Sequence, residues 1–302
     1  MQSSMLSIKP MPYGSSVGPL SAYCSVVSPL CSSREPMQQI QVNDCEIAYQ
    51  TRGHGAPLLL VHGFPLDHSM WRFQFETLAT QYHVIAPDLR GFGKSSRGTA
   101  PISMSQFAVD LNELLDAIDI QAPITFCGLS MGGYIGWEFW RQFPQRLARL
   151  IQCDTRSIGD TEVIARGRRQ MAARIAEQGS RGSALAADGM IPKLFSKSSM
   201  QAIPERVQQL RQVIASSDPA IIAETQLALA NRQDATNWLA DINVPTLLLC
   251  GEHDGISPSD EMRAIADALP QAQFEVIKDV GHMAPLENPQ TVNQIIRRFL
   301  TN

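Results

Sequence analysis

The sequence has little that would support a disulfide scaffold, a metal centre or a membrane span. Its 302 residues include six cysteines, which form no C-x-x-C pair and no cluster with histidine. We therefore expect reduced thiols and no metal. No uninterrupted apolar run reaches the roughly 18 residues that a membrane helix needs, so a membrane protein is not expected. The cysteines are Cys24, Cys31, Cys45, Cys127, Cys153 and Cys250.

An excess of positive charge is also missing. The formal net charge is −4, which argues against nucleic acid as a partner, because nucleic-acid-binding proteins concentrate lysine and arginine. The chain is long enough to bury a large core. These features predict a cytoplasmic globular protein that binds neither nucleic acid nor a membrane, with homo-oligomerisation left open.

Residues 1–36 are nearly free of charge, show no sustained periodicity and are rich in serine, proline and glycine. Lys9 is their only early positive charge, and Pro19 and Pro29 interrupt the mildly apolar stretch between them, so a signal peptide is not expected. We predict a disordered extension that ends where structure begins, at Met37. A mis-assigned start codon at Met37 is the alternative.

Continuous apolar runs, typical of strands buried on both faces, alternate with segments of helical periodicity. This rhythm predicts a mostly parallel sheet of about eight strands with helices on both faces. The pattern over 40–49 indicates one or two edge strands that turn at Asn43-Asp44. The other expected strands are 57–61, 83–87, 124–127, 147–153, 245–250 and 274–277, and the expected helices are 71–81, 104–118, 131–143, 258–269 and 288–300.

The rhythm breaks between residues 155 and 243, where helical patterns follow one another with no comparable strand. Because it resumes afterwards, we predict a helical cap inserted into a core made of residues 37–154 and 244–302. A separate helical domain is the alternative. The helices expected in the insertion are 164–178, 206–215 and 219–230.

Residues 128–132 read Gly-Leu-Ser-Met-Gly and lie between an expected strand and an expected helix. A serine exposed at the tip of such a turn needs neighbours without Cβ atoms, because strand and helix crowd together there. Ser130 would also lie at a helix N-terminus, where free N–H groups favour negative charge. The pattern predicts a nucleophile, although a glycine-rich turn that happens to contain serine gives the same five letters.

Polar residues follow several expected strands at the edge where parallel sheets bind ligands. They are His62-Gly63-Phe64-Pro65, then Ser130, then Glu252-His253-Asp254, then Gly281-His282. A serine, an acid and a histidine thus occur in the order Ser, Asp, His, which one particular fold uses for its catalytic triad.

From about residue 39 onward, the chain resembles the α/β-hydrolases. Within that superfamily it is similar to small cap-bearing esterases, 3-oxoadipate enol-lactonases, cofactor-free haloperoxidases and carbon–carbon hydrolases. The signatures that carry the resemblance, in order, are His62-Gly63-Phe64-Pro65, Asp88 to Ser95, Gly128 to Gly133, Gly251-Glu252-His253-Asp254 and Gly281 to Glu287.

The resemblance implies Ser130 as nucleophile, His282 as base and Asp254 as the acid that orients it. The N–H groups of Phe64 and Met131 would bind the oxyanion. No metal or organic cofactor is implied. A serine at position 130 argues against dehalogenases and epoxide hydrolases of similar shape, which use aspartate there.

Several alternatives to these residue assignments remain open. Asp154 ends the strand after the nucleophile helix and competes with Asp254 as the acid. His62 is expected to support the oxyanion turn, and His253 adjoins the proposed acid, so we favour His282 as the base. Asp88 is expected to brace loops, as is Arg90.

The substrate pocket is the least constrained part of the site. Trp71, Met131 and Met283 are candidates for its lining. The insertion also carries arginines that a carboxylate-bearing substrate would suit, although a solvated helical face explains them equally well. These arginines are Arg166, Arg168, Arg169 and Arg174.

We therefore expect a serine hydrolase that cleaves small carboxylic esters or lactones through an acyl-enzyme. The alternatives are a carbon–carbon hydrolase of ring-cleavage products, a perhydrolase that uses hydrogen peroxide, and a non-enzymatic ligand receptor on the same fold. Such receptors often lose a triad member, and all three members are present here.

Overall fold

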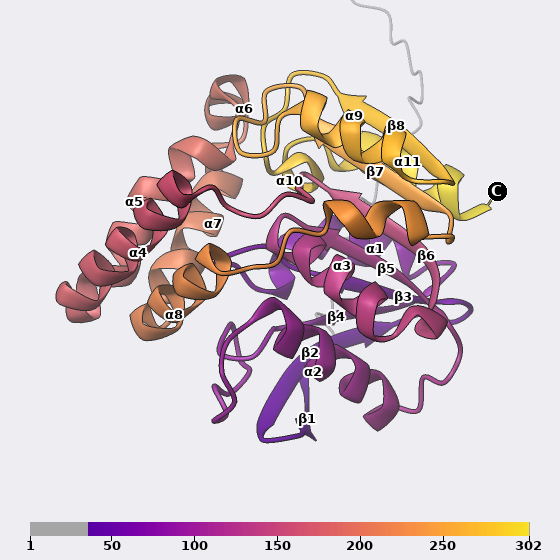
Figure 1. The fold of residues 1–302 in the computed structure, drawn as a ribbon, viewed down its shortest axis with the longest axis horizontal. Helices are drawn as coiled ribbons and strands as arrows, with labels where there is room; N and C mark the ends of the chain where they lie inside the picture. Colours follow the sequence, from indigo (N-terminus) through magenta and orange to yellow (C-terminus); the bar gives the residue numbers. More distant parts are fainter. Residues whose placement is uncertain (1–35, 302) are drawn as a thin grey trace, which may run out of the picture. The chain divides into compact units, whose positions relative to one another are not determined.

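An eight-stranded sheet forms the centre of the computed structural model, which describes residues 36–301 (Figure 1). The predicted extension, residues 1–36, lies outside the described residues apart from Pro36. The strand order is β1-β2-β4-β3-β5-β6-β7-β8. The strands are β1 (Gln38–Val42), β2 (Cys45–Arg52), β3 (Pro57–Val61), β4 (His83–Pro87), β5 (Ile124–Leu129), β6 (Leu147–Cys153), β7 (Thr246–Gly251) and β8 (Ala272–Ile277).

Five of the seven strand pairings are parallel, and only β1–β2 and β2–β4 are antiparallel. The central strands are buried along their length: every residue of β3, β5 and β7 is buried. Their continuous apolar runs therefore fit strands of a sheet whose two faces are both covered by helices. The predicted fold, a mostly parallel sheet of about eight strands, is confirmed.

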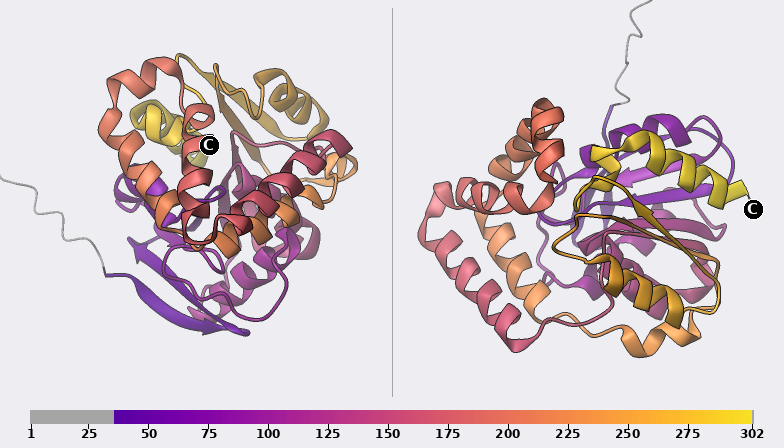
Figure 2. Two further views of the ribbon diagram at one scale, coloured as in Figure 1. Left: turned by 90° about the vertical axis from the view of Figure 1, so that its left-hand side faces the viewer. Right: turned by 90° about the horizontal axis from the view of Figure 1, so that it is seen from above.

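Helices cover both faces of the sheet (Figure 2). α1 (Arg72–Leu78) and α11 (Pro289–Thr301) pack together on one face. α2 (Met104–Ala117) and α3 (Met131–Gln142) pack together on the other, with α9 (Ser259–Ala268). Short turns complete the core: η1 (His68–Trp71), η2 (Pro144–Arg146), η4 (Thr236–Asp241) and α10 (Ala284–Glu287).

Five further helices lie between β6 and β7, to the left of the sheet in Figure 1. α4 packs along α8, and α5 packs along α7. Sequence periodicity predicted α4, α7 and α8 but not α5 or α6. The helices of this insertion are α4 (Glu162–Glu177), η3 (Gly179–Arg181), α5 (Gly182–Leu194), α6 (Lys197–Ala202), α7 (Pro204–Ser216) and α8 (Pro219–Ala230).

Within residues 36–301, no helix combines the length and the apolarity that crossing a bilayer requires. The four cysteines of this part of the chain, Cys45, Cys127, Cys153 and Cys250, are buried and unbridged. Burial raises the pKa of the Cys45 thiol to about 11, so that thiol stays protonated. The predicted cytoplasmic location stays a prediction.

Candidate active site

Ser130 stands at a sharp turn between β5 and α3. Its φ of 54° and ψ of −111° lie outside the regions that L-residues ordinarily occupy. The turn brings strand and helix very close together. A Cβ on Gly128 would lie 2.3 Å from the carbonyl oxygen of Gly132, and a Cβ on Gly132 would lie 2.3 Å from that of Val61. Both glycines are therefore required by close approach, and the turn leaves Ser130 partly exposed.

Hydrogen bonds from β6 and the loop after it hold this turn. The N–H of Ser130 donates to the Cys153 carbonyl at 2.9 Å, and Thr155 Oγ1 donates to the Ser130 carbonyl at 2.8 Å. Met131 is the first residue of α3. Its N–H is therefore one of those at a helix start that no carbonyl of the same helix accepts.

The loop after β3 lies directly beside the serine. A Cβ on Gly63 would be 3.5 Å from the Ser130 Cβ. The neighbouring His62 is fully buried; its Nδ1 donates to the Gly63 carbonyl at 2.9 Å, and its Nε2 accepts the Leu89 N–H at 3.0 Å. Burial lowers the pKa of His62, so the ring is neutral and both nitrogens are used. His62 braces the loop, as expected from the sequence.

Asp254 and His282 form a buried pair. Asp254 follows β7 and His282 follows β8, and His282 Nδ1 donates to Asp254 Oδ2 at 2.8 Å. The other carboxylate oxygen accepts the N–H groups of Ile256 at 2.7 Å and Ser257 at 3.0 Å. Three donors thus converge on one carboxylate.

Asp154, the rival acid, is close to this pair but differently bonded. Its Oδ1 accepts the Gly251 N–H at 2.8 Å, whereas its Oδ2 is buried without a partner among residues 36–301. Burial first, and then the negative charge of Asp254, raise the pKa of Asp154 well above its ordinary value. Asp154 is therefore a neutral acid, and the histidine hydrogen-bonds to Asp254 instead.

Three groups of acid and histidine side chains hold potential metal-ligand atoms within 4.8 Å of one another in the described chain. In one of them, Asp88 already accepts the ring and backbone N–H groups of His68, and also the Lys94 N–H. The groups are Asp67, His68 and Asp88; Asp154, Asp254 and His282; and Glu252, His253 and Asp279.

The candidate pocket residues are buried around the serine loop. Trp71, Met131 and Met283 are each 0% exposed, and Phe64 is 7% exposed. The indole nitrogen of Trp71 has no hydrogen-bond partner in the described part of the chain. η1, which ends at Trp71, packs against α10, which begins directly after Met283. Trp71 and Met283 therefore belong to neighbouring elements.

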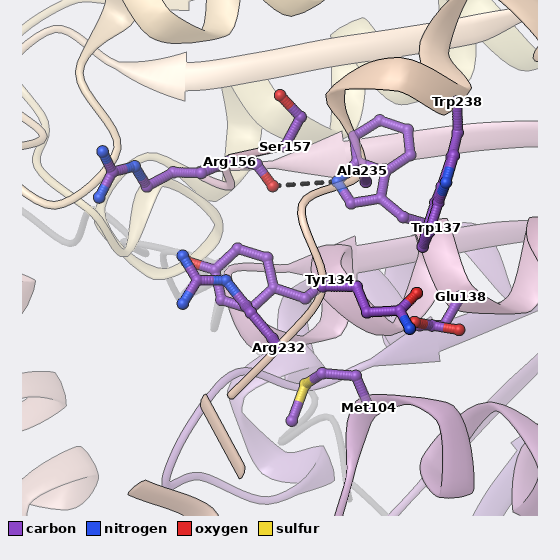
Figure 3. Close-up of a pocket in the computed structure, with 10 residues that line it drawn as sticks. Met104, Tyr134, Trp137, Glu138, Arg156, Ser157, Arg232, Ala235 and Trp238 are labelled. Atoms are coloured by element: carbon purple, nitrogen blue, oxygen red, sulfur yellow. Dashed lines mark hydrogen bonds between the residues drawn. The ribbon is translucent and has the colours of Figure 1, made fainter. Parts of the chain in front are cut away.

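Two hollows lie along α3, away from the predicted catalytic residues, none of which lines either of them. Figure 3 shows the smaller one, in which the Arg232 guanidinium lies 4.4 Å from the ring centre of Tyr134. In the same view, Trp137 Nε1 donates to the Arg156 carbonyl at 3.0 Å. The adjoining groove, of about 580 Å³, lies between α2, α3 and α8.

Two of the candidate arginines, Arg168 and Arg169, pair with acids of the same insertion. Arg168 contacts Asp160 at 2.5 Å, and Arg169 contacts Glu162 at 2.6 Å. These ion pairs account for the two arginines without a substrate, so the structure lends no support to the carboxylate clamp at those positions.

Sequence reasoning gave no role to Glu287. Its carboxylate accepts the N–H groups of Gly281, Met283 and Ser196. An acid five residues after the expected base, at the end of a short helical turn, was the available signal. Only the folded chain brings Ser196 to it.

Comparison of the sequence with known protein families identifies the class to which this fold and site belong. A family described as "alpha/beta hydrolase fold" matches residues 56–289, which is more than half of the chain. The chain belongs to the α/β-hydrolase family. The predicted family and the hydrolase class are confirmed.

Several named proteins are similar over almost the whole described chain. An esterase from Thermogutta terrifontis, solved with malate bound, is 41% identical, with a TM-score of 0.83 over 88% of this chain and 98% of that one. The enol-lactonase from Burkholderia xenovorans is 26% identical, with a TM-score of 0.80 over 88% of this chain and 100% of that one. The 3-oxoadipate enol-lactonase 2 of Acinetobacter baylyi is 28% identical over 86% of this chain and 95% of its own.

Proposed function

We propose that the protein is a serine hydrolase that cleaves small carboxylic esters or lactones through an acyl-enzyme. The observation that carries the proposal is the pair of His282 and Asp254 on the same sheet edge as the strained turn at Ser130. β5, β6, β7 and β8 are neighbours in the sheet, so the ends of parallel strands bring the three residues to one rim. The esterase and enol-lactonase names of similar proteins support the substrate class.

The chemistry follows from the acidities of the three groups. A serine hydroxyl is too weak an acid to attack an ester unaided, so His282 takes the proton of Ser130 as the new C–O bond forms. The imidazolium then gives that proton to the leaving alcohol. Asp254 fixes the ring with Nδ1–H toward itself, which leaves Nε2 free to act as base, and it stabilises the imidazolium. Water repeats the sequence and releases the acid.

The N–H groups of Met131 and Phe64 are the proposed oxyanion donors. Met131 offers the unbonded N–H of a helix start, where the dipole also favours negative charge. Phe64 belongs to the loop that lies beside Ser130. Losing one such donor typically slows the chemical step about 10²- to 10³-fold.

Residues 155–243 are the proposed cap, with 37–154 and 244–302 as the catalytic core. Trp71, Met131 and Met283 are the proposed lining of the acyl pocket because they are large, apolar and buried on elements next to the catalytic loops. An apolar lining favours a small apolar acyl group over a charged one.

The proposal is tested by turnover of p-nitrophenyl acetate by the purified protein. We expect wild-type turnover that rises with ester concentration to saturation, and loss of at least about 10³-fold in the Ser130→Ala variant. Equal turnover by wild type and variant would contradict the assignment of Ser130.

A substrate panel separates the proposed activity from its alternatives. Small esters and lactones should be hydrolysed, and adding hydrogen peroxide should divert part of the acyl-enzyme to peracid, because peroxide competes with water. Cleavage of a ring-fission diketone in preference to every ester would favour the carbon–carbon hydrolase. Saturable ligand-induced rises in melting temperature without turnover would favour the receptor.

A further inference from the structure

One carboxylate ties the loop that carries His282 to the helical insertion. Glu287 Oε1 accepts the N–H of Gly281 at 2.9 Å and that of Met283 at 3.2 Å. Glu287 Oε2 accepts the N–H of Ser196 at 3.0 Å. Gly281 and Met283 flank His282 on either side, and Ser196 caps the start of α6 in the insertion. The Glu287 side chain therefore bonds both to the loop that carries His282 and to the helical insertion.

The backbones that Glu287 joins are in direct contact. The N–H of Met283 also donates to the Leu194 carbonyl at 3.1 Å, and Ser196 Oγ donates to the Asp279 carbonyl at 3.1 Å. A Cβ on Gly281 would lie 2.7 Å from the Ser196 nitrogen. The junction of α5 and α6 therefore rests on the histidine loop with no space for an added methyl group.

The insertion holds the far end of the same loop as well. Arg206 of α7 donates from Nη1 to the Leu286 carbonyl at 2.8 Å. Its guanidinium also lies 4.6 Å from the ring centre of Phe73 in α1. The segment from Asp279 to Glu287 thus contacts the insertion at both ends, with His282 between them.

We propose that Glu287 is a positioning residue that makes the alignment of His282 depend on how the helical insertion is seated. Charge-assisted bonds to two N–H groups fix the backbone on both sides of the histidine. The third bond, to Ser196, is lost if the insertion lifts, and the histidine loop then loses part of its support. The inference rests on the proposed function, because it takes His282 to be the base.

Substitution of Glu287 separates a positioning role from a purely structural one. Glu287→Ala removes the carboxylate that accepts the Gly281 N–H and leaves the Met283 N–H with only the Leu194 carbonyl. We expect kcat to fall by about 10²-fold, the typical cost of misplacing a catalytic group by about 1 Å. KM should change less than about threefold, because Glu287 bonds the backbone of Met283 and not the side chains proposed to line the acyl pocket. Glu287→Gln keeps one acceptor oxygen and should recover at least a tenth of wild-type kcat. A folded Glu287→Ala variant with kcat within about threefold of wild type would overturn the proposal.

Two variants of Ser196 test the link to the insertion alone. The residue has φ −63° and follows Phe195 at φ −112° and ψ 148°, a conformation that proline accepts. Ser196→Ala removes the hydroxyl bonds but keeps the N–H. Ser196→Pro replaces the N–H with a ring carbon that points at Glu287, so it breaks the bond and pushes the insertion away from the histidine loop. We expect kcat of the proline variant to be at least about fivefold below that of the alanine variant. Equal kcat values would overturn the coupling.

Amide hydrogen exchange tests the same link without any activity. In Glu287→Ala, we expect faster exchange over both 194–199 and 279–284, since one side chain protects both segments. Faster exchange in only one segment, or in neither, would contradict the coupling. Hydrogen exchange stays informative even if the wild-type protein hydrolyses no ester. Absence of hydrolysis would count against the proposed function, but not against the coupling of the histidine loop to the insertion through Glu287.

Discussion

At the scale of single residues, two neighbouring acids are hydrogen-bonded very differently. Asp254 accepts three hydrogen bonds, one of them from His282. Asp154 accepts one from the Gly251 N–H, and its Oδ2 has no hydrogen-bond partner within residues 36–301. Burial and then the negative charge of Asp254 raise the pKa of Asp154 well above its ordinary value. The histidine thus pairs with the acid that accepts more hydrogen bonds.

Substituting each acid by asparagine should separate their roles. Asp254→Asn removes the charge and the tautomer control of His282, and we expect kcat to fall by about 10⁴-fold, as in other triads. Asp154→Asn exchanges one neutral group for another of similar shape, so kcat should stay within about tenfold. Steady-state kinetics of both variants checks this, and the opposite ranking would show that Asp154 is the working acid.

The pair of His68 and Asp88 should make stability depend on pH. Burial opposes the charge on His68, but the 2.6 Å bond to Asp88 outweighs it, so the pKa of His68 is raised. A raised histidine pKa adds stability that is complete below the unfolded value and is lost as pH rises through the folded value. The contribution should therefore be larger in mild acid than in alkali.

The matched comparison is the melting temperature of wild type and His68→Asn. The difference between them should be larger at about pH 5.5 than at about pH 9, where the imidazole of the wild type is neutral. Because the pKa of Asp88 is lowered, its own contribution is lost only in stronger acid. An unchanged difference across this window would show that the charge on His68 adds no stability.

At the scale of elements, the turn between β5 and α3 requires glycine because backbone atoms of neighbouring segments approach closely there. Gly132→Ala would place a methyl carbon 2.3 Å from the Val61 carbonyl, so β3 and α3 must separate. We expect a loss of about 2 to 3 kcal/mol in the free energy of unfolding, typical of overpacking. Denaturant unfolding measures it.

Gly189→Ala is the matched control in the helical insertion. A Cβ there meets nothing within 4 Å, and the residue lies inside α5. Alanine is the better helix former, so stability should rise by about 0.5 to 1 kcal/mol. If both variants shifted stability alike, close packing at Gly132 would not explain its presence.

The sequence predicted elements well where one strong pattern decided them. The bounds of β3, β4 and β6 match the predicted ranges. All of β3 and most of β4 and β6 are buried, although Arg149 of β6 is only partly so. α5 was missed because Gly182, Gly189 and Pro192 lie within it. Its helical state comes from packing against α7, which no local pattern reveals. Glu287 was missed for the same reason, since Ser196 is distant along the chain.

At the scale of the whole molecule, Arg90 links segments that local patterns leave separate. Its guanidinium is fully buried and bonds Asp110 of α2 through Nε at 2.7 Å and Nη2 at 2.8 Å. Nη2 also contacts Asp44, in the turn between β1 and β2, at 2.8 Å. The role predicted for Arg90, a brace between loops, agrees with these contacts.

Removing Arg90 should therefore destabilise the whole sheet edge. Arg90→Met leaves Asp110 buried without its charged partner, and we expect a loss of about 3 to 5 kcal/mol in the free energy of unfolding. Adding Asp110→Leu should recover part of that loss, because no buried unpaired charge then remains: Asp44, the other partner of Arg90, is partly exposed. Thermal unfolding of the single and double variants checks this. A double variant less stable than the single one would contradict the argument.

The substrate could not be read from the sequence for a physical reason. Ser130, Asp254 and His282 each follow a strand of the sheet, so strand order alone brings them to the same edge. The residues proposed to line the acyl pocket lie instead in or beside η1, α3 and α10, whose mutual packing depends on long-range contacts. The same separation explains why the family was recognisable from five short signatures while the acyl group was not.

The central claim is that the hydroxyl at the strained turn is the nucleophile, and covalent labelling tests it most directly. The purified protein is treated with a fluorophosphonate, and the modified peptide is mapped by mass spectrometry. We predict one adduct, on Ser130, that is absent from Ser130→Ala and is strongly slowed in His282→Ala. No adduct on Ser130, or labelling that persists in Ser130→Ala, would contradict the account.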